Sequence, residues 1–498
     1  MLSKNAISLI QQRYAHKGET PELVLKRVAK ALSLGDERFE KALFKLMLDG
    51  VFLPASPTLR NAGIKKTLLH PCHVLPIYDS IDSIFECIKN SAIIFHYGGG
   101  VGYNMSELRP KGFPLSSGGE SSGVVSFLEI FDKVTDVVRQ GGFRRGASLA
   151  VLDYDHPEIE NFITSKLSGR LSNFNISVLV NNEFMSKINS EEKIDLKFNK
   201  KAVGSIKAKD IFDLISYSAY LVGDPGLLFY DRINQDNKLL STGAEIKACN
   251  PCGEVPLLPW NCCNLGAINL SKFANKNSFD FKKFSKAVEL GIRTLRNINS
   301  IGWYPFPEMS KQMKLNDPCG LGFLGFADCL IKLGIYYDSD EAIRFIDEIC
   351  KPYVEITDRI APESFYKRSQ QPTGSLSILA DASPGIEPVF HKEFERRLSV
   401  GIIEEVRSLY KSKYCRTAHE ISPEWHLKIQ SAFQKYIDAG VSKTCNIPNG
   451  SSVEEIRQIY IMAYKMGVKG ITVFRDNCKN GQQIIVKKQS CEDGTCYL

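Results

Sequence analysis

Helical and strand-like patterns alternate along most of this chain, and that alternation restricts the possible folds more than any other feature. Apolar residues recur at three- and four-residue spacing in amphipathic segments, and short β-like runs lie between those segments. The helical pattern covers residues 83–97, 126–140, 210–222, 281–299, 340–360 and a segment that begins after Ser452. The strand-like pattern covers residues 178–180, 265–270 and 376–379. No clear repeat or low-complexity linker interrupts the chain, so the order of elements predicts an α/β protein with one large core.

Three regions differ in their patterns. Residues 1–50 show helical spacing alone, and we expect an N-terminal helical segment there. Residues 51–477 contain the alternating elements and form the expected α/β domain. Residues 478–498 are polar and rich in Lys and Gln, so we expect a flexible tail.

The composition is that of a water-soluble globular protein, with 43% hydrophobic and 24% charged residues. The net charge of +7 suits anionic small molecules such as nucleotides, but without a basic block it gives little support for nucleic-acid binding. The polar start lacks the apolar stretch of a secretory signal, and no apolar run reaches transmembrane length. We therefore expect a cytoplasmic protein with no nucleic-acid and no membrane partner. In that reducing compartment most of the 14 cysteines are thiols, and a disulfide would be transient and catalytic.

Four cysteines lie within fifteen positions, at Cys249, Cys252, Cys262 and Cys263. The first two have the C-x-x-C spacing of a zinc site, but two adjacent cysteines cannot readily supply the other two tetrahedral ligands. A thioredoxin-like motif would need a short βαβ context, which is missing here. We therefore predict no metal site. Plain buried thiols remain the alternative to a catalytic role.

The residues between these cysteines favour catalysis. Asn250, Cys252 and Glu254 lie at every second position, so on an extended loop their side chains would point to one side. That arrangement would surround a small substrate with an amide, a thiol and a carboxylate. A carboxylate beside a thiol can act as general base on a hydroxyl group.

Residues 248–254 read Ala-Cys-Asn-Pro-Cys-Gly-Glu, and Cys263 follows eleven positions after Cys252 and precedes Asn-Leu-Gly-Ala-Ile-Asn-Leu. This pattern resembles the catalytic region of the ribonucleotide reductase large chain. Other segments resemble that family in the same order, namely 54–63, 79–84, 98–102, 108–112, 140–147, 372–375, 385–388 and 470–476. Ordered agreement from about residue 5 to residue 496 is more specific than any single motif.

The resemblance implies a role for each matching residue. Cys252 would carry a thiyl radical that removes the 3′-hydrogen of the ribose, and Glu254 would be the base on the 3′-hydroxyl. Asn250 would bind the 2′ and 3′ oxygens. Cys72 and Cys263 would deliver two electrons and end as a disulfide when water leaves C2′.

Two nucleotide sites are implied by the same resemblance. The substrate-binding residues would be Ser56, Thr373, Gly374 and Ser375, where small side chains let hydroxyl and N–H groups approach phosphates. A dNTP or ATP effector would bind Asp79, Arg109 and Lys111, and Gln140 and Arg144 would read its identity. The sequence does not distinguish diphosphate from triphosphate substrates.

The family fold implies a ten-stranded α/β barrel, built of two five-stranded parallel halves, with Cys252 on a central finger loop. Cys491 and Cys496 would form a redox pair in the tail that is itself reduced by thioredoxin or glutaredoxin. The family is usually a homodimer. The first helices run almost at once into the catalytic motifs, so we expect a short form without the amino-terminal ATP-cone.

A motif near the C-terminus indicates which radical source to expect. Thr472 and Val473 stand where class I chains have two adjacent tyrosines, and neither side chain can be oxidised. Tyr460 and Tyr464 precede them and are expected to be packing residues. The resemblance is therefore closest to class II chains, which use adenosylcobalamin. Three alternatives remain: a class I chain with a di-metal radical subunit, a glycyl-radical lyase on the same barrel, and a non-enzymatic nucleotide-binding regulator.

Overall fold

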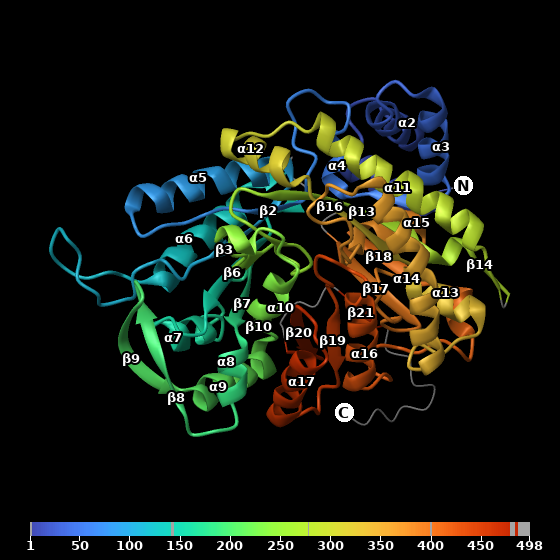
Figure 1. The fold of residues 1–498 in the computed structure, drawn as a ribbon. Coiled ribbons are helices and arrows are strands. Elements are labelled where there is room, and N and C mark those ends of the chain that lie inside the picture. The colour runs from blue at the N-terminus through green and yellow to red at the C-terminus, as the bar shows by residue number, and fades with distance from the viewer. Residues whose placement is uncertain (1, 141–143, 277, 399–400, 479–483, 487–498) are drawn as a thin grey trace.

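The computed structural model describes residues 2–140, 144–276, 278–398, 401–478 and 484–486 (Figure 1). Three helices begin the chain, α1 (Lys4–Arg13), α2 (Pro21–Leu32) and α3 (Glu37–Leu48), as the sequence predicts for residues 1–50. Each starts at a polar residue whose side chain accepts a backbone N–H, which satisfies a donor that a helix start leaves unpaired. Their apolar faces share one buried core with α11 (Phe281–Ile301).

Five parallel strands form the first half of the central sheet. Their order in space is the order in the chain: β2 (Cys72–Val74), β3 (Gly100–Asn104), β6 (Ser148–Asp153), β7 (Phe174–Val180) and β10 (Gly226–Phe229). Helices lie between them in sequence, namely α5 (Ile81–Tyr97), α6 (Val124–Val137), α7 (Ile159–Thr164) and α9 (Ala208–Val222). Parallel strands need such crossovers, because a tight turn cannot join them.

A second parallel group completes the sheet. It contains β13 (Cys262–Asn269), β16 (Cys319–Leu324), β19 (Thr444–Ile447) and β20 (Gly470–Arg475). The extended segment 366–371 lies between β16 and the chain leading into β19, with parallel bridges from Leu321 to Arg368 and from Gln370 to Val441. Helices α14 (Asp340–Ile360), α16 (Pro423–Gln434) and α17 (Val453–Lys465) accompany this group. A short strand, β1 (Phe52–Pro54), runs antiparallel along β13.

The two groups of strands pair with each other at both edges, and the strands of one group run opposite to those of the other. β13 pairs antiparallel with β2, and β20 pairs antiparallel with β10. With the segment 366–371 counted as a strand, ten strands therefore form a closed ring of two five-stranded parallel halves. The helices lie around this ring in Figure 1. The α/β barrel predicted from the motifs is confirmed.

A finger loop enters the barrel between β11 (Ala248–Cys249) and β12 (Pro256–Leu257), which pair antiparallel. Its apolar residues share a buried cluster with side chains of β2, β6, β7, β10 and β13. Glycines on the wall make room for it. A Cβ on Gly102 of β3 would lie 1.7 Å from the carbonyl oxygen of Cys249, and one on Gly440 would lie 2.9 Å from that of Gly253.

Most predicted elements are present, with two corrections. Residues 376–379 belong to a helix, α15 (Gly374–Ala380), and not to a strand. A four-residue apolar run does not distinguish the two structures, and here the Thr373 carbonyl accepts from the Ser377 N–H and starts a helical turn. Helix α6 ends at Val137, before the predicted residue 140, because the chain enters β4 (Arg139–Gln140). The predicted helix after Ser452 is α17, whose capping box has both hydrogen bonds.

Within the described part of the chain, no helix has both the length and the apolar character that a membrane span requires.

Candidate active site

The tip of the finger loop is a tight turn. The N–H of Gly253 donates to the carbonyl oxygen of Asn250 at 3.0 Å, and Gly253 has a φ of +80°. Cys252 is therefore exposed at the tip, whereas Asn250 and Glu254 are 1% and 2% exposed. The backbone is a tight turn and not the extended loop expected, because the left-handed glycine bends the chain within the motif. The three side chains nevertheless converge on Cys72. Asn250 donates to its Sγ, and, in addition to burial, the charges of Glu254 and Cys252 both raise its pKa.

Cys72 and Cys263 face each other across two strands. They are direct partners in the antiparallel pair β2–β13, where opposite side chains lie on the same face. Cα atoms of such partners are about 4.5–5.5 Å apart, which is within the range of roughly 4.4–6.8 Å that a disulfide needs. Cys262 is the partner of His73 and packs in a different core cluster, on the outer face of β13. Cys263 and not Cys262 thus shares the barrel interior with Cys72.

Asn250 connects the finger loop to this cysteine pair. Its Nδ2 donates to Cys72 Sγ at 3.0 Å. Its Oδ1 accepts from the N–H of Val255 at 2.9 Å and from Cys249 Sγ at 3.4 Å. A backbone N–H can only donate, so Val255 fixes which end of the amide points toward Cys72.

Burial sets the protonation state of the site. It raises the pKa of Glu254 to about 7, and the interaction with the Asn250 amide opposes that rise. Among the described residues, Glu254 Oε2 has no hydrogen-bond partner, which leaves it available to a ligand. Burial also raises the pKa of Cys72 and Cys263, and the Glu254 carboxylate adds to this effect. Both cysteines therefore stay thiols near neutral pH, and a carboxylate that titrates near 7 can act as a general base.

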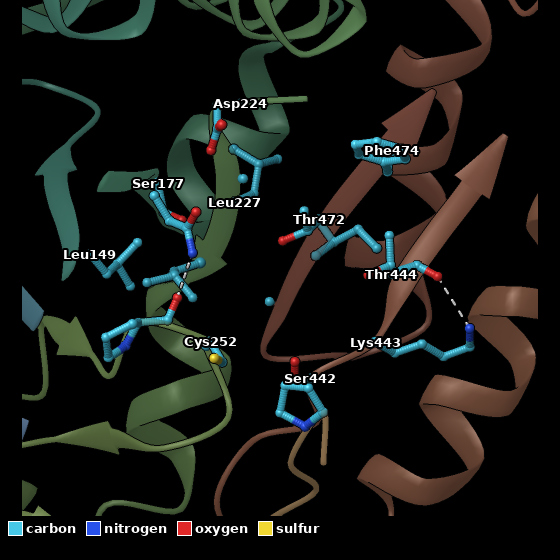
Figure 2. A pocket seen from close by; sticks show the side chains of 18 of the residues that line it. Leu149, Ser177, Asp224, Leu227, Cys252, Ser442, Lys443, Thr444, Thr472 and Phe474 are labelled. Carbon is cyan, nitrogen blue, oxygen red and sulfur yellow. Dashed lines mark hydrogen bonds between the residues drawn. The ribbon is translucent and has the colours of Figure 1, made fainter. Parts of the chain in front are cut away.

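A cavity of about 270 Å³ lies on the exposed side of Cys252. Figure 2 shows it between Ser177 and Leu227 on one wall and Thr444 and Thr472 on the other. The walls also include Gly226 and Gly470, and the buried Lys443 there is paired with Glu387 at 2.9 Å. Glycines, hydroxyl groups and a neutralised ion pair suit a polar, uncharged group such as a nucleoside.

Of the residues considered in the prediction of the radical source, one lies at this cavity. Thr472 lines it, whereas Val473 is 1% exposed in the outer core. The hydroxyl of Tyr460 donates to the Pro225 carbonyl oxygen, and that of Tyr464 donates to Asn182 Oδ1, each at 2.8 Å. Both tyrosines pack elsewhere, as predicted, and neither lines the cavity.

The comparisons with known proteins agree with this geometry. A family model described as ribonucleotide reductase, barrel domain, matches residues 71–354 and 402–474, and one described as ribonucleotide reductase, all-alpha domain, matches residues 1–67. The chain belongs to the ribonucleotide reductase family. The family and the kind of enzyme predicted from the motifs are thus confirmed.

Several relatives of this reductase chain carry informative names. It is 39% identical to a vitamin B12-dependent ribonucleoside-diphosphate reductase of Thermoplasma acidophilum, over 89% of this chain and 66% of the relative. It is 35% identical to a protein of the same name from Mycobacterium tuberculosis, over 97% of this chain and 80% of the relative. A ribonucleoside-diphosphate reductase subunit alpha of Chlamydia pneumoniae is 23% identical, over 91% of this chain and 57% of the relative.

The predicted substrate residues of the reductase lie on two segments. Thr373 precedes α15 with a φ of +52°, and its Oγ1 accepts from the Gly385 N–H at 2.7 Å. Gly374 and Ser375 begin α15, and Ser56 begins α4 (Ser56–Asn61). Two further residues that no motif indicated lie at this place, namely Arg13, which contacts Ser375, and Tyr14, which contacts Ser56. No local pattern could have indicated them, since these partners are 362 and 42 positions apart.

The predicted effector residues are brought together in part. Asp79 accepts from the backbone N–H of Arg109 at 3.0 Å and from its Nε at 3.1 Å. Lys111 is exposed two positions further on. Gln140 in β4 pairs with Arg144 in β5 (Arg144–Arg145), which forms a short hairpin, but their side chains lie outside the description. The tail cysteines, Cys491 and Cys496, also lie outside the described residues.

Proposed function

We propose that this chain reduces ribonucleoside diphosphates to 2′-deoxyribonucleoside diphosphates. The observation that carries this proposal is the register of β2 and β13, which sets Cys263 opposite Cys72 beneath the finger loop. The Asn250 amide, at 3.0 Å from Cys72 Sγ, ties that pair to the loop that presents Cys252. Relatives named ribonucleoside-diphosphate reductase support the diphosphate as substrate.

Once Cys252 carries a radical, these residues alone supply every hydrogen atom, proton and electron that the proposed reaction needs. The Cys252 thiyl takes the 3′-hydrogen and returns it at the end. Glu254 takes the proton of the 3′-hydroxyl and later gives it back. The 2′-hydroxyl leaves as water, and the two thiols of Cys72 and Cys263 supply two electrons and two protons as they become a disulfide.

The radical source in this proposal is adenosylcobalamin. Relatives named vitamin B12-dependent support it, and so does the nucleoside-compatible cavity beside Cys252. When bound, this cofactor would supply the radical by homolysis of its cobalt–carbon bond. Ser177, Thr444 and Thr472 would hold its nucleoside part in the cavity, and the apolar side chains around them would exclude water.

The proposal includes regulation and partners. A dNTP or ATP effector would bind at Asp79, Arg109 and Lys111, where its ribose and phosphates would replace the present Asp79–Arg109 ion pair. Gln140 and Arg144 would pass its identity to the active site. Cys491 and Cys496 would reduce the disulfide and would in turn be reduced by thioredoxin or glutaredoxin.

The test uses the purified full-length chain with adenosylcobalamin, dithiothreitol, a dNTP and CDP. We expect dCDP as product and a coupled cobalt(II)–thiyl signal in the electron paramagnetic resonance spectrum. Cys252→Ser should abolish both, because the serine O–H bond is much harder to break homolytically. No dCDP with adenosylcobalamin, but activity on adding a di-metal subunit, would contradict the proposed radical source.

A further inference from the structure

The end of the first helix contacts both segments of the proposed phosphate site. Arg13, the last residue of α1, donates from Nη1 to Ser375 Oγ at 3.0 Å. The next residue, Tyr14, shares a hydrogen bond of 2.9 Å with Ser56 Oγ. Two consecutive residues of one helix end therefore hold the two serines beside each other.

The surroundings of this helix end are positively charged. Arg60 donates from Nη1 to the carbonyl oxygen of Arg13 at 2.6 Å. Burial lowers the pKa of Arg60, and the nearby charge of Arg27 lowers it further. Arg27 itself pairs with Glu19 at 2.7 Å. Arginine stays protonated in proteins, so the guanidinium groups of Arg13, Arg27 and Arg60 bring positive charge to this helix end, which favours a bound anion.

The site is open on one side. Gly374, between Thr373 and Ser375, is exposed, and a Cβ placed on it would meet no atom of the described residues within 4 Å. Ser56 and Ser375 are only partly buried. A ligand that approaches over Gly374 can therefore reach the Ser375 hydroxyl and the Arg13 guanidinium that donates to it.

We propose that Arg13 binds the terminal phosphate of a ribonucleoside diphosphate and that Tyr14 positions Ser56 for the same group. This inference rests on the proposed function and deepens it. A guanidinium presents donors in a planar fork that matches a phosphate, and such charge-assisted bonds are the strong ones. The helical segment thus belongs to the substrate site, and its arginine makes the enzyme prefer a diphosphate over the free nucleoside.

The experiment compares Arg13→Gln with the wild type by titration calorimetry on the full-length protein. An excess of a dNTP is present, so that only the substrate site is measured. We expect the affinity for CDP to fall about tenfold, which is the effect of losing one charge-assisted hydrogen bond. The affinity for cytidine should stay unchanged. Arg13→Lys should lose part of the CDP affinity, because lysine lacks the fork. Lys4→Gln, an exposed cation at the other end of α1, should bind CDP as the wild type does.

Two results would overturn the inference: unchanged CDP affinity in Arg13→Gln, or equal losses for CDP and cytidine, which would indicate a purely structural role. If Arg13→Gln does not fold, the same comparison of CDP with cytidine in Arg13→Lys decides. These are binding measurements, so a wild-type protein that binds CDP but forms no dCDP would contradict the proposed reaction and not the role of Arg13.

Discussion

Glu254 is the residue whose environment makes the most specific prediction about pH. It must be deprotonated to accept the proton of the 3′-hydroxyl, and burial raises its pKa to about 7. We therefore expect kcat/KM for CDP to rise with pH up to about 7 and then level off. Glu254→Gln should lower kcat by a factor of about 10² or more and remove this acid limb. A wild-type profile that is flat from pH 5 to 8 would rule out Glu254 as the base.

The same shift affects stability. Between the ordinary pKa of 4.5 and about 7, the folded state holds a proton on Glu254 that the unfolded state has released. The free energy of unfolding should therefore fall as pH rises through this window, and Glu254→Gln should reduce that slope. Urea titrations at several pH values measure it. Glu308→Gln, which changes an exposed carboxyl on helix α12 (Pro307–Asn316), should leave the slope as it is.

The neighbouring cysteines of β13 offer a matched pair of substitutions. Cys263→Ser removes one member of the facing pair, so we expect the loss of multiple turnover with any reductant. Cys262→Ser changes a buried thiol on the opposite face, so it should cost stability but keep turnover per folded molecule. Product assays normalised to folded protein distinguish them. Normal turnover of Cys263→Ser would assign the redox role to another thiol.

At the scale of elements, the passage of the finger loop through the barrel depends on Gly102. A Cβ there would overlap the Cys249 carbonyl oxygen, at 1.7 Å, and because that oxygen is a backbone atom it cannot move aside as the end of a flexible side chain could. We expect Gly102→Ala to cost about 1–3 kcal/mol or more of unfolding free energy and to impair turnover by displacing the loop. Chemical denaturation and dCDP formation measure the two effects. Gly204→Ala, on the exposed strand β9 (Lys201–Lys207), should be harmless, because its Cβ would contact Leu196 Cδ1 at an ordinary 3.8 Å and no other atom of the described residues within 4 Å.

The sequence predicts elements and motifs better than it predicts their spatial arrangement. Periodic helices such as α9, α11 and α14 lie where expected, because their apolar spacing records which face is buried. The turn at Gly253 was missed, since a glycine can adopt either sign of φ and only packing selects one. The contact of Arg13 with Ser375 is set by how α1 packs on the barrel, so no local pattern encodes it.

At the scale of the whole molecule, two adjoining helices present apolar side chains to solvent. Ile81 and Phe85 on α5 are 62% and 49% exposed, and Val137 at the end of α6 is 64% exposed. Figure 1 shows α5 and α6 side by side on the outside of the first half of the barrel. Exposed apolar groups on neighbouring helices favour association, and this surface supports the homodimer expected from the family.

If the surface of α5 and α6 is the dimer interface, a charge placed on it should change the mass of the protein in solution. Phe85→Glu would place a charge in the proposed interface, where its desolvation is costly, so we expect the variant to elute as a monomer and the wild type to elute as a dimer. Light scattering coupled to size-exclusion chromatography measures this. Leu315→Glu changes a side chain that is 68% exposed on α12 (Pro307–Asn316) and should keep the dimer. A Phe85→Glu variant with the dimer mass would exclude this surface as the interface. If the dimer is lost, the response of substrate choice to dNTPs should weaken with it, because Asp79 stands two positions before α5 and would be held by the same contact.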